Sequence, residues 1–416
     1  MKTDAIRMRS ASPLATGDPD GHIQLHGLLD EAACDRLLSE RELTLRTQIR
    51  EVVAADVAPR ARELDQSHTF AHDSYQALAQ AGFGGLLFPR RWGGTEDTNV
   101  AYAVAMEEIA AGCAATSLVF MTQMHAAYPI WQAGSERLAD RHLPGIIDGS
   151  AYGALAITEP DAGSDVASMK TRARHDGSSD IYRLSGSKTF ITTGDKANVL
   201  VCFATVDPRL GRKGITAFVV DGDSPGLTRG NPFHKMGMHG STTAEVFLDQ
   251  VPVRADHMLG SEGSGWQVVM ASVVKSRISA AAQGVGIARA AYAATLAALR
   301  AIHGRTLPPE ALFALADLRG QILQGRLLLL ATARDVDHAD NPSRAQIGIM
   351  KQTCTDLGFK VSTAAARILG PYGDLADLGV ERCVRDAKVT QIYDGTNEVQ
   401  RLLVGRETTK QLEELE

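Results

Sequence analysis

The sequence predicts an α+β multidomain protein with an all-α N-terminal domain, a central antiparallel β-barrel and a C-terminal four-helix bundle. Three observations support this prediction. Apolar residues at helical spacing dominate residues 41–150, short β-rich runs separated by turn signals follow, and long Ala/Leu-rich segments fill the rest of the chain. The 416 residues, 44% of them hydrophobic, suffice to form more than one core.

The N-terminal part carries the helical pattern. Apolar residues recur at helical spacing from Leu45 to Val57, just before Pro59, and this spacing predicts an amphipathic helix with one buried side. Further helices are expected over 74–81, 101–111 and 135–143, each followed by Gly or by Pro and Gly. We therefore predict a helical domain over 41–150, preceded by a flexible extension over 1–40.

The middle part changes to β-rich sequence. Short runs at 181–184, 199–203, 215–220 and 244–248 are rich in β-branched and aromatic residues, and turn signals such as Asp176-Gly177 separate them. No helix-length crossover lies between the runs, so the strands are expected to pair antiparallel in a barrel domain over 151–256.

The C-terminal part returns to helix. Long Ala/Leu-rich segments over 268–299, 310–336 and 343–369, joined by short connections, predict an antiparallel four-helix bundle over 257–416. The apolar run 327–331 is too short to span a bilayer, and Arg326 and Arg334 flank it, so it is expected to be core helix.

Charge and cysteine content limit the kinds of function that the sequence allows. A formal charge of -6 without a concentrated basic block argues against nucleic-acid binding, so small molecules or proteins are the expected partners. Five widely separated cysteines predict free thiols in a reducing compartment, with neither disulfides nor a metal site. No apolar signal segment stands in the first 40 residues. We expect a cytoplasmic protein without membrane contact.

The stretch 156–165, Ala-Ile-Thr-Glu-Pro-Asp-Ala-Gly-Ser-Asp, is the most informative motif. Gly163 and Ser164 offer backbone N–H groups and a hydroxyl that suit a pyrophosphate, and Thr158 suits the edge of an electron-poor ring. The alternative is an ordinary turn, because Pro, Asp and Gly cluster in any turn. Lys188 ends a Ser-x-x-Lys string at 185–188, which we interpret as a surface turn because its usual partner motifs are missing.

Three further motifs follow: Lys-Thr-Phe-Ile-Thr at 188–192, Lys-Met-Gly-Met-His-Gly-Ser at 235–241, and Tyr-Asp-Gly-Thr at 393–396 with Arg401 behind it. Together with 156–165 they resemble the acyl-CoA dehydrogenase family from residue 41 onward. The resemblance implies that family's fold, with FAD as cofactor and α,β-dehydrogenation of an acyl-CoA or acyl-carrier-protein thioester to the 2-enoyl thioester. It also implies a homodimer or homotetramer and reoxidation by an electron-transfer flavoprotein or similar acceptor.

The family's chemistry needs a carboxylate base over the α-carbon of the substrate, and the resemblance assigns that role to Asp394. The family usually has Glu there, and Asp is one methylene shorter, a reach deficit of about 1.5 Å. Misplacement by about 1 Å can cost on the order of a hundredfold in rate. Ser276 stands at the family's other base position and cannot serve. The alternative for Asp394 is the N-cap of the following helix.

The resemblance also assigns cofactor and substrate contacts. Phe190 stands where the family often has Trp beside the ring. The residues expected at the flavin are Leu155, Ile157, Thr158, Gly163, Ser164, Phe190, Ile191, Thr192, Gly395, Thr396 and Glu398. Those expected at the substrate are Ser164, Arg277 and Gly395. Met121, Met124, His125 and Tyr128 are candidates for the acyl pocket, although core packing explains them equally well.

The adenylate half of the cofactor site departs from the family. Where the family reads Gln-Ile-Leu-Gly-Gly-x-Gly, residues 367–373 read Arg-Ile-Leu-Gly-Pro-Tyr-Gly. Arg300, Arg305 and Arg367, with Gly370, are expected to reach the pyrophosphate through charge-assisted hydrogen bonds; otherwise the arginines are solvated helix ends. These departures leave open a non-redox acyl-binding homologue with a weakened FAD site. A flavin oxidase or monooxygenase of the same superfamily also stays open, because some of its members carry Asp at the base position.

Overall fold

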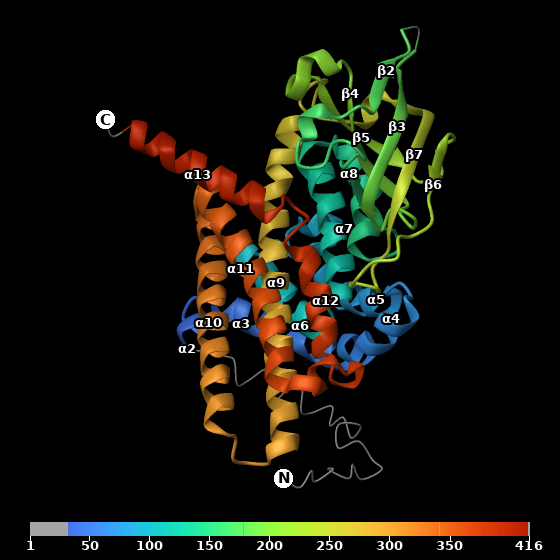
Figure 1. The fold of residues 1–416 in the computed structure, drawn as a ribbon. Helices are drawn as coiled ribbons and strands as arrows, with labels where there is room; N and C mark the ends of the chain where they lie inside the picture. The colour runs from blue at the N-terminus through green and yellow to red at the C-terminus, as the bar shows by residue number, and fades with distance from the viewer. Residues whose placement is uncertain (1–31, 178, 341, 415–416) are drawn as a thin grey trace.

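The N-terminal part of the computed structural model is helical, as predicted. The structure describes residues 32–177, 179–340 and 342–414 (Figure 1). The part of the predicted extension over 1–31 lies outside these residues, whereas Cys34 in the first described helix is buried. The helices are α2 (Ala32–Asp35), α3 (Glu40–Val52), α4 (Ala61–Ser67), α5 (His72–Gln80), α6 (Asn99–Gly112), α7 (Ala114–Ala133) and α8 (Glu136–Ile147).

Two prolines do not end helical structure where the sequence predicted an end. Before α4, the chain continues through a π-helical turn (Val53–Val57) and a 3₁₀ turn that contains Pro59 (Ala58–Arg60). Helix α8 runs through Pro144 to Ile147, so the predicted end at 143 is wrong. A proline removes one helical hydrogen bond, but apolar side chains are buried on both sides of Pro144, and their burial offsets that loss.

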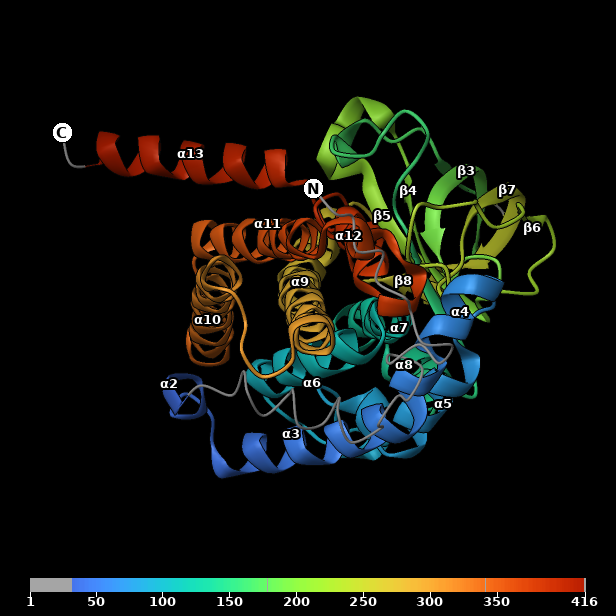
Figure 2. The same cartoon turned by 60° about the horizontal axis from the view of Figure 1, so that its bottom comes forward.

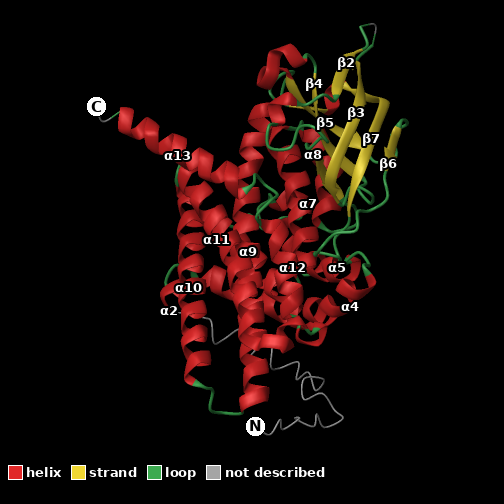
Figure 3. Ribbon diagram, in the orientation of Figure 1, coloured by secondary structure: helices red, strands yellow, loops and turns green. Residues whose placement is uncertain are grey.

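Helix α7 is the central element that the sequence pattern did not reveal. All but a few of its 20 residues are buried, so it carries no alternation between an apolar and a polar face. A helix that is buried all round gives no amphipathic signal. Figure 3 shows α7 between the strands and the C-terminal helices, and it packs against both α9 and β1.

The middle part is one eight-stranded sheet with the order β6-β7-β3-β2-β4-β5-β8, and β1 pairs with β4 off this path. Most pairs are antiparallel as predicted, but β1 pairs with β4 parallel over four residues, and β2 meets β4 parallel at one. Closure into a barrel is not confirmed, because the terminal strands β6 and β8 are not paired with each other among the described residues. The strands are β1 (Gly153–Ala156), β2 (Arg172–His175), β3 (Ile181–Thr192), β4 (Val199–Thr205), β5 (Ile215–Asp221), β6 (Leu227–Arg229), β7 (Thr243–Arg254) and β8 (Met258–Leu259).

The C-terminal helices pack beside one another, and the last helix projects away from them (Figure 2). They are α9 (Gly265–His303), α10 (Pro309–His338), α11 (Arg344–Leu369), α12 (Val380–Thr390) and α13 (Asn397–Glu413). By length and composition α9 alone among the described helices passes as a membrane span, yet 61% of its most apolar window is buried within the protein. Core helices pass the same test, and α9 packs against α6, α7, α10, α11 and α12.

The cysteines are as the sequence predicted. All five cysteines are buried thiols, as their spacing predicted. Domain boundaries at 40, 150 and 256 stay predictions.

Candidate active site

Asp394 lies in the short turn between α12 and α13. Its φ is +57° and that of Gly395 is +84°, so two successive residues adopt the left-handed conformation. For a residue with a side chain this conformation costs about 1 kcal/mol. At Gly395 the positive φ favours glycine, and an added Cβ would lie 2.6 Å from Nε2 of Gln400, whose side chain would have to shift. The turn therefore holds Asp394 in a conformation that the surrounding contacts must maintain.

Several hydrogen bonds maintain this turn. Lys351 Nζ donates hydrogen bonds of 3.0 Å to the carbonyl oxygen of Gly395 and to Oδ1 of Asn397. The Tyr393 hydroxyl donates to Oε1 of Gln283, a fully buried residue of α9. Thr396 caps α13 by accepting a hydrogen bond from the third helical residue. The alternative reading of Asp394 as the helix N-cap is therefore wrong, because Thr396 takes that place.

The carboxyl group of Asp394 is shielded but not saturated with hydrogen bonds. Its Oδ2 atom is inaccessible to solvent and has no hydrogen-bond partner among the described residues. Burial raises the pKa of Asp394 above the ordinary carboxyl value, while His125, Lys351 and the neighbouring Ser276 and Arg277 act in the opposite direction. A carboxyl group with a raised pKa and an unpaired oxygen is a candidate general base.

Arg277 on α9 lies beside this turn. Its guanidinium is buried, and Nε finds no hydrogen-bond partner in the described part of the chain. Burial lowers the pKa of Arg277 to about 10, and the nearby Asp394 limits that decrease. Nη2 is 3.7 Å from the point that a Cβ on Gly395 would occupy. The structure thus brings the predicted substrate residues Arg277 and Gly395 to Asp394, whereas Ser164 lies in a different segment.

That segment, which we name the Thr158 loop (residues 156–165), is anchored by a buried ion pair. Lys188 Nζ lies 2.7 Å from Oε1 of Glu159 and donates to the carbonyl oxygen of Ile157 at 3.0 Å. Glu159 also accepts from the backbone N–H groups of Lys170 and Thr171, at 2.6 and 3.0 Å. The charges thus neutralise each other in the core and fix the loop.

The prediction of a surface turn at 185–188 is wrong. These residues lie within β3, and the side chain of Lys188 is fully buried. Side chains alternate across a strand, so a lysine in β3 can face inward, where Glu159 balances its charge. The Glu inside the 156–165 motif was the signal for this pairing, because a buried lysine needs a partner.

The exposed face of the Thr158 loop continues onto the end of β3. Thr189 N–H donates to the carbonyl oxygen of Thr158 at 2.9 Å, and a bulge between Lys188 and Ile191 interrupts the pairing with β7. Phe190 sits in this bulge with φ +56°, and its side chain is 67% exposed. Its ring centroid lies 5.3 Å from that of Phe233. A strained backbone that presents an aromatic ring to solvent is typical of a ligand-binding surface.

The same face offers hydrogen-bond donors. The described residues provide no acceptor for the backbone N–H groups of Gly163 and Ser164, and both residues are exposed. Gly163 lies against Thr158, whose Cγ2 would be 4.0 Å from an added Cβ. Free N–H groups in the loop and an exposed aromatic ring at the end of β3 fit a planar ring system joined to a phosphate group. The residues present therefore fit a flavin.

The remaining predicted flavin residues differ in what they can contribute. Ile191 is 2% exposed, so only its backbone can face a ligand. Leu155, Ile157 and Thr192 are half-buried around the same loop and strand end. Glu398 is exposed in the first turn of α13, 3.7 Å from Arg401. The geometry thus groups Leu155, Ile157 and Thr192 with the Thr158 loop and places Glu398 with the Asp394 turn.

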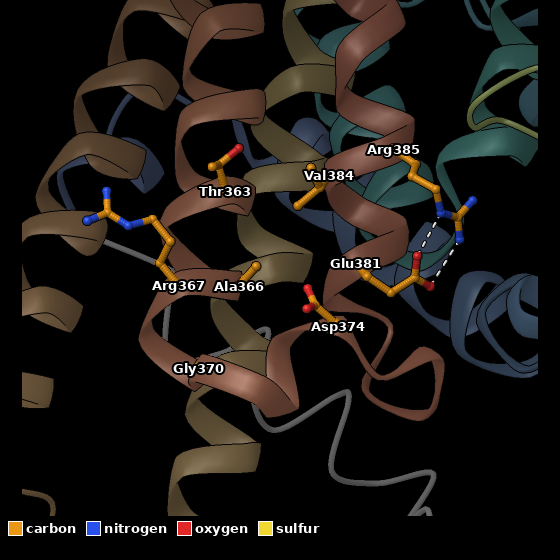
Figure 4. Close-up of a pocket in the computed structure, with 8 residues that line it drawn as sticks. All are labelled: Thr363, Ala366, Arg367, Gly370, Asp374, Glu381, Val384 and Arg385. Atoms are coloured by element: carbon orange, nitrogen blue, oxygen red, sulfur yellow. Dashed lines mark hydrogen bonds and ion pairs between the residues drawn. The ribbon is translucent and has the colours of Figure 1, made fainter.

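A second region carries Arg367 and Gly370. They line a pocket of about 420 Å³ between the end of α11 and the start of α12, shown in Figure 4. Arg367 points away from the carboxylate of Glu381, which pairs with Arg385 at 2.6 Å. The full lining is Thr363, Ala366, Arg367, Gly370, Asp374, Glu381, Val384 and Arg385. Arg300 and Arg305 do not line it; they are exposed at and beyond the end of α9.

No metal-binding arrangement accompanies these groups. In 32–177, 179–340 and 342–414, no cluster of three or more His, Cys, Asp or Glu side chains is placed to hold a metal ion. The polar groups that sequence reasoning missed are Lys351 and Gln283, which position the Asp394 turn, and Tyr102, which interacts electrostatically with Asp394. The available signal was the presence of polar residues within Ala- and Leu-rich helices. A polar side chain is rarely buried unless it has a hydrogen-bond partner or a functional role.

Comparison with known proteins agrees with this geometry. The chain matches the models of the acyl-CoA dehydrogenase N-terminal domain over residues 39–150, the middle domain over 154–251 and the C-terminal domain over 263–409. It is 38% identical to the cyclohex-1-ene-1-carbonyl-CoA dehydrogenase of Geobacter metallireducens, over 89% of this chain and 98% of that protein.

Solved structures agree as well. The butyryl-CoA dehydrogenase from Megasphaera elsdenii superposes with a TM-score of 0.84 at 33% identity, over 89% of this chain and 99% of that one. A chain in the structure of the electron transferring flavoprotein of Acidaminococcus fermentans has a TM-score of 0.85 at 32% identity, over 89% and 98% of the two chains. The protein thus belongs to the acyl-CoA dehydrogenase family and is an FAD-dependent oxidoreductase that acts on the CH–CH group of an acyl thioester.

Proposed function

We propose that Asp394 is the base that removes the α-proton of an acyl-CoA. The observation that carries this proposal is the Oδ2 atom of Asp394, which is shielded from solvent, lacks a hydrogen-bond partner among the described residues and belongs to a carboxyl group of raised pKa. A raised pKa strengthens a carboxylate as a base, and an unpaired oxygen is free to receive the proton. Arg277 and Gly395 lie beside it, where the thioester end of the substrate would bind.

The flavin would be held by the Thr158 loop and the end of β3. The free N–H groups of Gly163 and Ser164 would bind its phosphate side, and Thr158, Phe190 and Thr192 would contact the ring. Bound FAD would supply the hydride acceptor for the β-hydrogen of the substrate. Helix α7 packs against β1, which leads into the Thr158 loop, and contacts α12, which leads into the Asp394 turn, so the scaffold is suited to place a base and a flavin on opposite sides of one substrate.

The relatives support a small acyl group on coenzyme A. Their names specify cyclohex-1-ene-1-carbonyl-CoA and butyryl-CoA, whose acyl parts are short or compact. An electron-transfer flavoprotein is the proposed acceptor, supported by the family and by the flavoprotein structure that contains a similar chain. A homodimer or homotetramer and a cytoplasmic location remain expectations.

The experiment that tests this function follows the visible flavin band without oxygen after addition of butyryl-CoA. The flavin band of the wild-type protein should bleach, because hydride transfer reduces the flavin. Asp394→Asn should retain the bound flavin but bleach about 10²–10⁴-fold more slowly, the range typical for loss of a general base. Asp317→Asn, which removes an exposed carboxylate of α10, should behave as the wild type.

Bleaching of Asp394→Asn at the wild-type rate would overturn the assignment of the base. Rapid reoxidation of the reduced wild-type protein by air would instead favour an oxidase. A protein that binds no FAD even after reconstitution would contradict the dehydrogenase function itself.

A further inference from the structure

The segment 233–241, which we name the junction loop, lies between β6 and β7 where the three parts of the chain meet. On one side, Ala71 at the start of α5 donates its backbone N–H to the carbonyl oxygen of Gly240 at 2.8 Å. On the other side, a Cβ added to Gly237 would lie 2.5 Å from the backbone of Arg385 on α12. The junction loop therefore contacts the N-terminal helices and the C-terminal helices at once.

His239 in this loop has an oxygen acceptor at each ring nitrogen. Nε2 lies 2.8 Å from the carbonyl oxygen of Lys235. Nδ1 lies 3.0 Å from the carbonyl oxygen of Asp65 on α4 and 2.9 Å from Oδ1 of the same residue. A carbonyl or carboxylate oxygen accepts a hydrogen bond but cannot donate one. Only the imidazolium form, with hydrogen on both nitrogens, satisfies these contacts, because either neutral tautomer leaves a nitrogen lone pair against an oxygen.

Asp65 is an ionised acceptor for this ring. The guanidinium of Arg385 donates to both of its carboxylate oxygens, at 2.9 and 2.6 Å. Burial raises the pKa of Asp65, but the hydrogen bonds and charge of Arg385, together with His239, outweigh burial and hold that pKa below its ordinary value. The carboxylate therefore has no proton to offer, and it connects α12 through α4 to the junction loop.

The ring of His239 also stacks on that of His68, with centroids 3.9 Å apart and planes 23° from parallel. His68 is exposed, and the nearby His239 is the main cause of the lowered pKa of His68. A neutral aromatic ring over a cationic one makes a favourable contact. The remaining titratable groups around this junction are His234, Lys235, Glu381, Arg382, Arg385 and Asp386.

We propose that His239, in its imidazolium form, is a positioning residue for the flavin, because it holds the junction loop so that Phe233 supports Phe190 against the ring of FAD. Phe233 stands two residues before Lys235, and its backbone N–H donates to the carbonyl oxygen of Thr243 at 2.8 Å. Its ring centroid lies 5.3 Å from that of Phe190. Loss of the proton removes one hydrogen bond of His239, loosens the loop and weakens FAD binding. The inference rests on the proposed function, because it places the flavin at Phe190.

The test measures the Kd of FAD by flavin fluorescence from about pH 6 to about pH 8.5, with FAD-free protein. The wild-type Kd should rise about threefold to tenfold over this range, because the flavin senses only part of the energy of one charge-assisted hydrogen bond. His239→Arg keeps a positive charge and N–H donors at every pH, so its Kd should vary much less with pH. His239→Gln is neutral throughout and should bind FAD weakly at every pH.

His234→Gln is the matched control. His234 is an exposed histidine of the same loop, so this variant should keep the pH dependence of the wild type. Burial raises the pKa of Asp386 to about 6, and Asp386 accepts a hydrogen bond from the backbone N–H of Met238. This carboxyl group therefore titrates near the lower end of the range, but it is present in every variant. The difference in slope between wild type and His239→Arg thus reports on His239.

A wild-type Kd that does not change with pH would overturn the inference, and so would an equal rise in His239→Arg and the wild type. If His239→Gln does not fold, the comparison of His239→Arg with the wild type decides alone.

Failure of the inference and failure of the proposed function give different results. If the protein binds FAD and butyryl-CoA bleaches it, while the Kd of FAD does not depend on His239, only the inference is wrong. If no FAD binds at any pH, the proposed function fails and the inference fails with it.

Discussion

Lys351 donates a hydrogen bond of 3.0 Å from Nζ to the carbonyl oxygen of Gly395, the residue that follows Asp394. Burial lowers the pKa of Lys351 to about 8, although Asp394 and other acids oppose this shift. The ammonium group in turn lowers the pKa of Asp394. One lysine of α11 therefore maintains both the conformation of the turn and the charge of the proposed base.

Replacement of this lysine should move the pH profile of the reaction. Lys351→Met removes a positive charge, so the pKa of Asp394 should rise further, and the acid limb of kcat/KM should shift to higher pH. Looser positioning of the turn should also lower kcat/KM at neutral pH by roughly tenfold. Lys360→Met, at an exposed position of the same helix, is the control. An acid limb that stays in place in Lys351→Met would show that the lysine does not act on the base.

Asp394→Asn should stabilise the fold while it removes activity. Because the folded-state pKa of Asp394 is raised, the native protein binds more protons than the unfolded chain between the unfolded and the folded pKa. Wild-type stability therefore falls as pH rises through that window, and the loss persists above it. Denaturant unfolding at several pH values should show a growing advantage of Asp394→Asn over wild type from acid to neutral pH. A variant that is less stable than wild type at neutral pH would contradict the raised pKa.

Much of the architecture was predictable because the decisive patterns are local. Helical spacing near Leu45 and the alternating texture of β-rich runs each depend on a few neighbouring residues. The parallel pairing of β1 with β4 was not predictable, because no local signal in the short run 153–156 specifies a partner more than 40 residues away. Helix α7 lacked a signal for the opposite reason, since uniform burial removes the periodicity on which such a prediction depends.

The candidate site shows the same contrast between local sequence patterns, which could be predicted, and contacts between distant segments, which could not. The motif around Asp394 identified the turn, and Gly395 was expected there. The sequence did not show that Lys351, more than 40 residues away, holds this turn, nor that Lys188 is buried against Glu159. Ion pairs and hydrogen bonds between distant segments depend on the packing of whole elements, and one sequence contains no direct signal for them.

Loss of the buried lysine in β3 should be costly. Lys188→Met leaves the carboxylate of Glu159 buried without its partner, and such breakage typically costs about 3–5 kcal/mol of the free energy of unfolding. Combination with Glu159→Gln should recover part of the loss, because the uncompensated charge is removed. Lys170→Met, which breaks the exposed pair with Asp161, should leave the free energy of unfolding close to that of the wild type. Denaturant titration measures the free energy of unfolding of each variant. Equal losses in Lys188→Met and Lys170→Met would refute the role of burial.

Phe190→Ala should weaken flavin binding without unfolding the protein. The side chain is 67% exposed, so its truncation removes little core packing. Loss of an aromatic contact with the flavin ring should cost about 1 kcal/mol, which is roughly a fivefold to tenfold rise in the Kd of FAD. Phe247→Ala, at an exposed aromatic of β7, is the control. Equal FAD affinity in Phe190→Ala and wild type, measured by flavin fluorescence, would show that Phe190 does not contact the flavin ring.

Exchange of the α-proton with solvent tests most directly whether Asp394 takes that proton. The protein is reconstituted with 5-deaza-FAD, incubated with butyryl-CoA in D₂O, and deuterium at the α-carbon is measured by mass spectrometry. We predict that the wild-type protein and Asp317→Asn catalyse the exchange, whereas Asp394→Asn loses it at least a hundredfold with its flavin still bound. Exchange at the wild-type rate in Asp394→Asn would contradict the account.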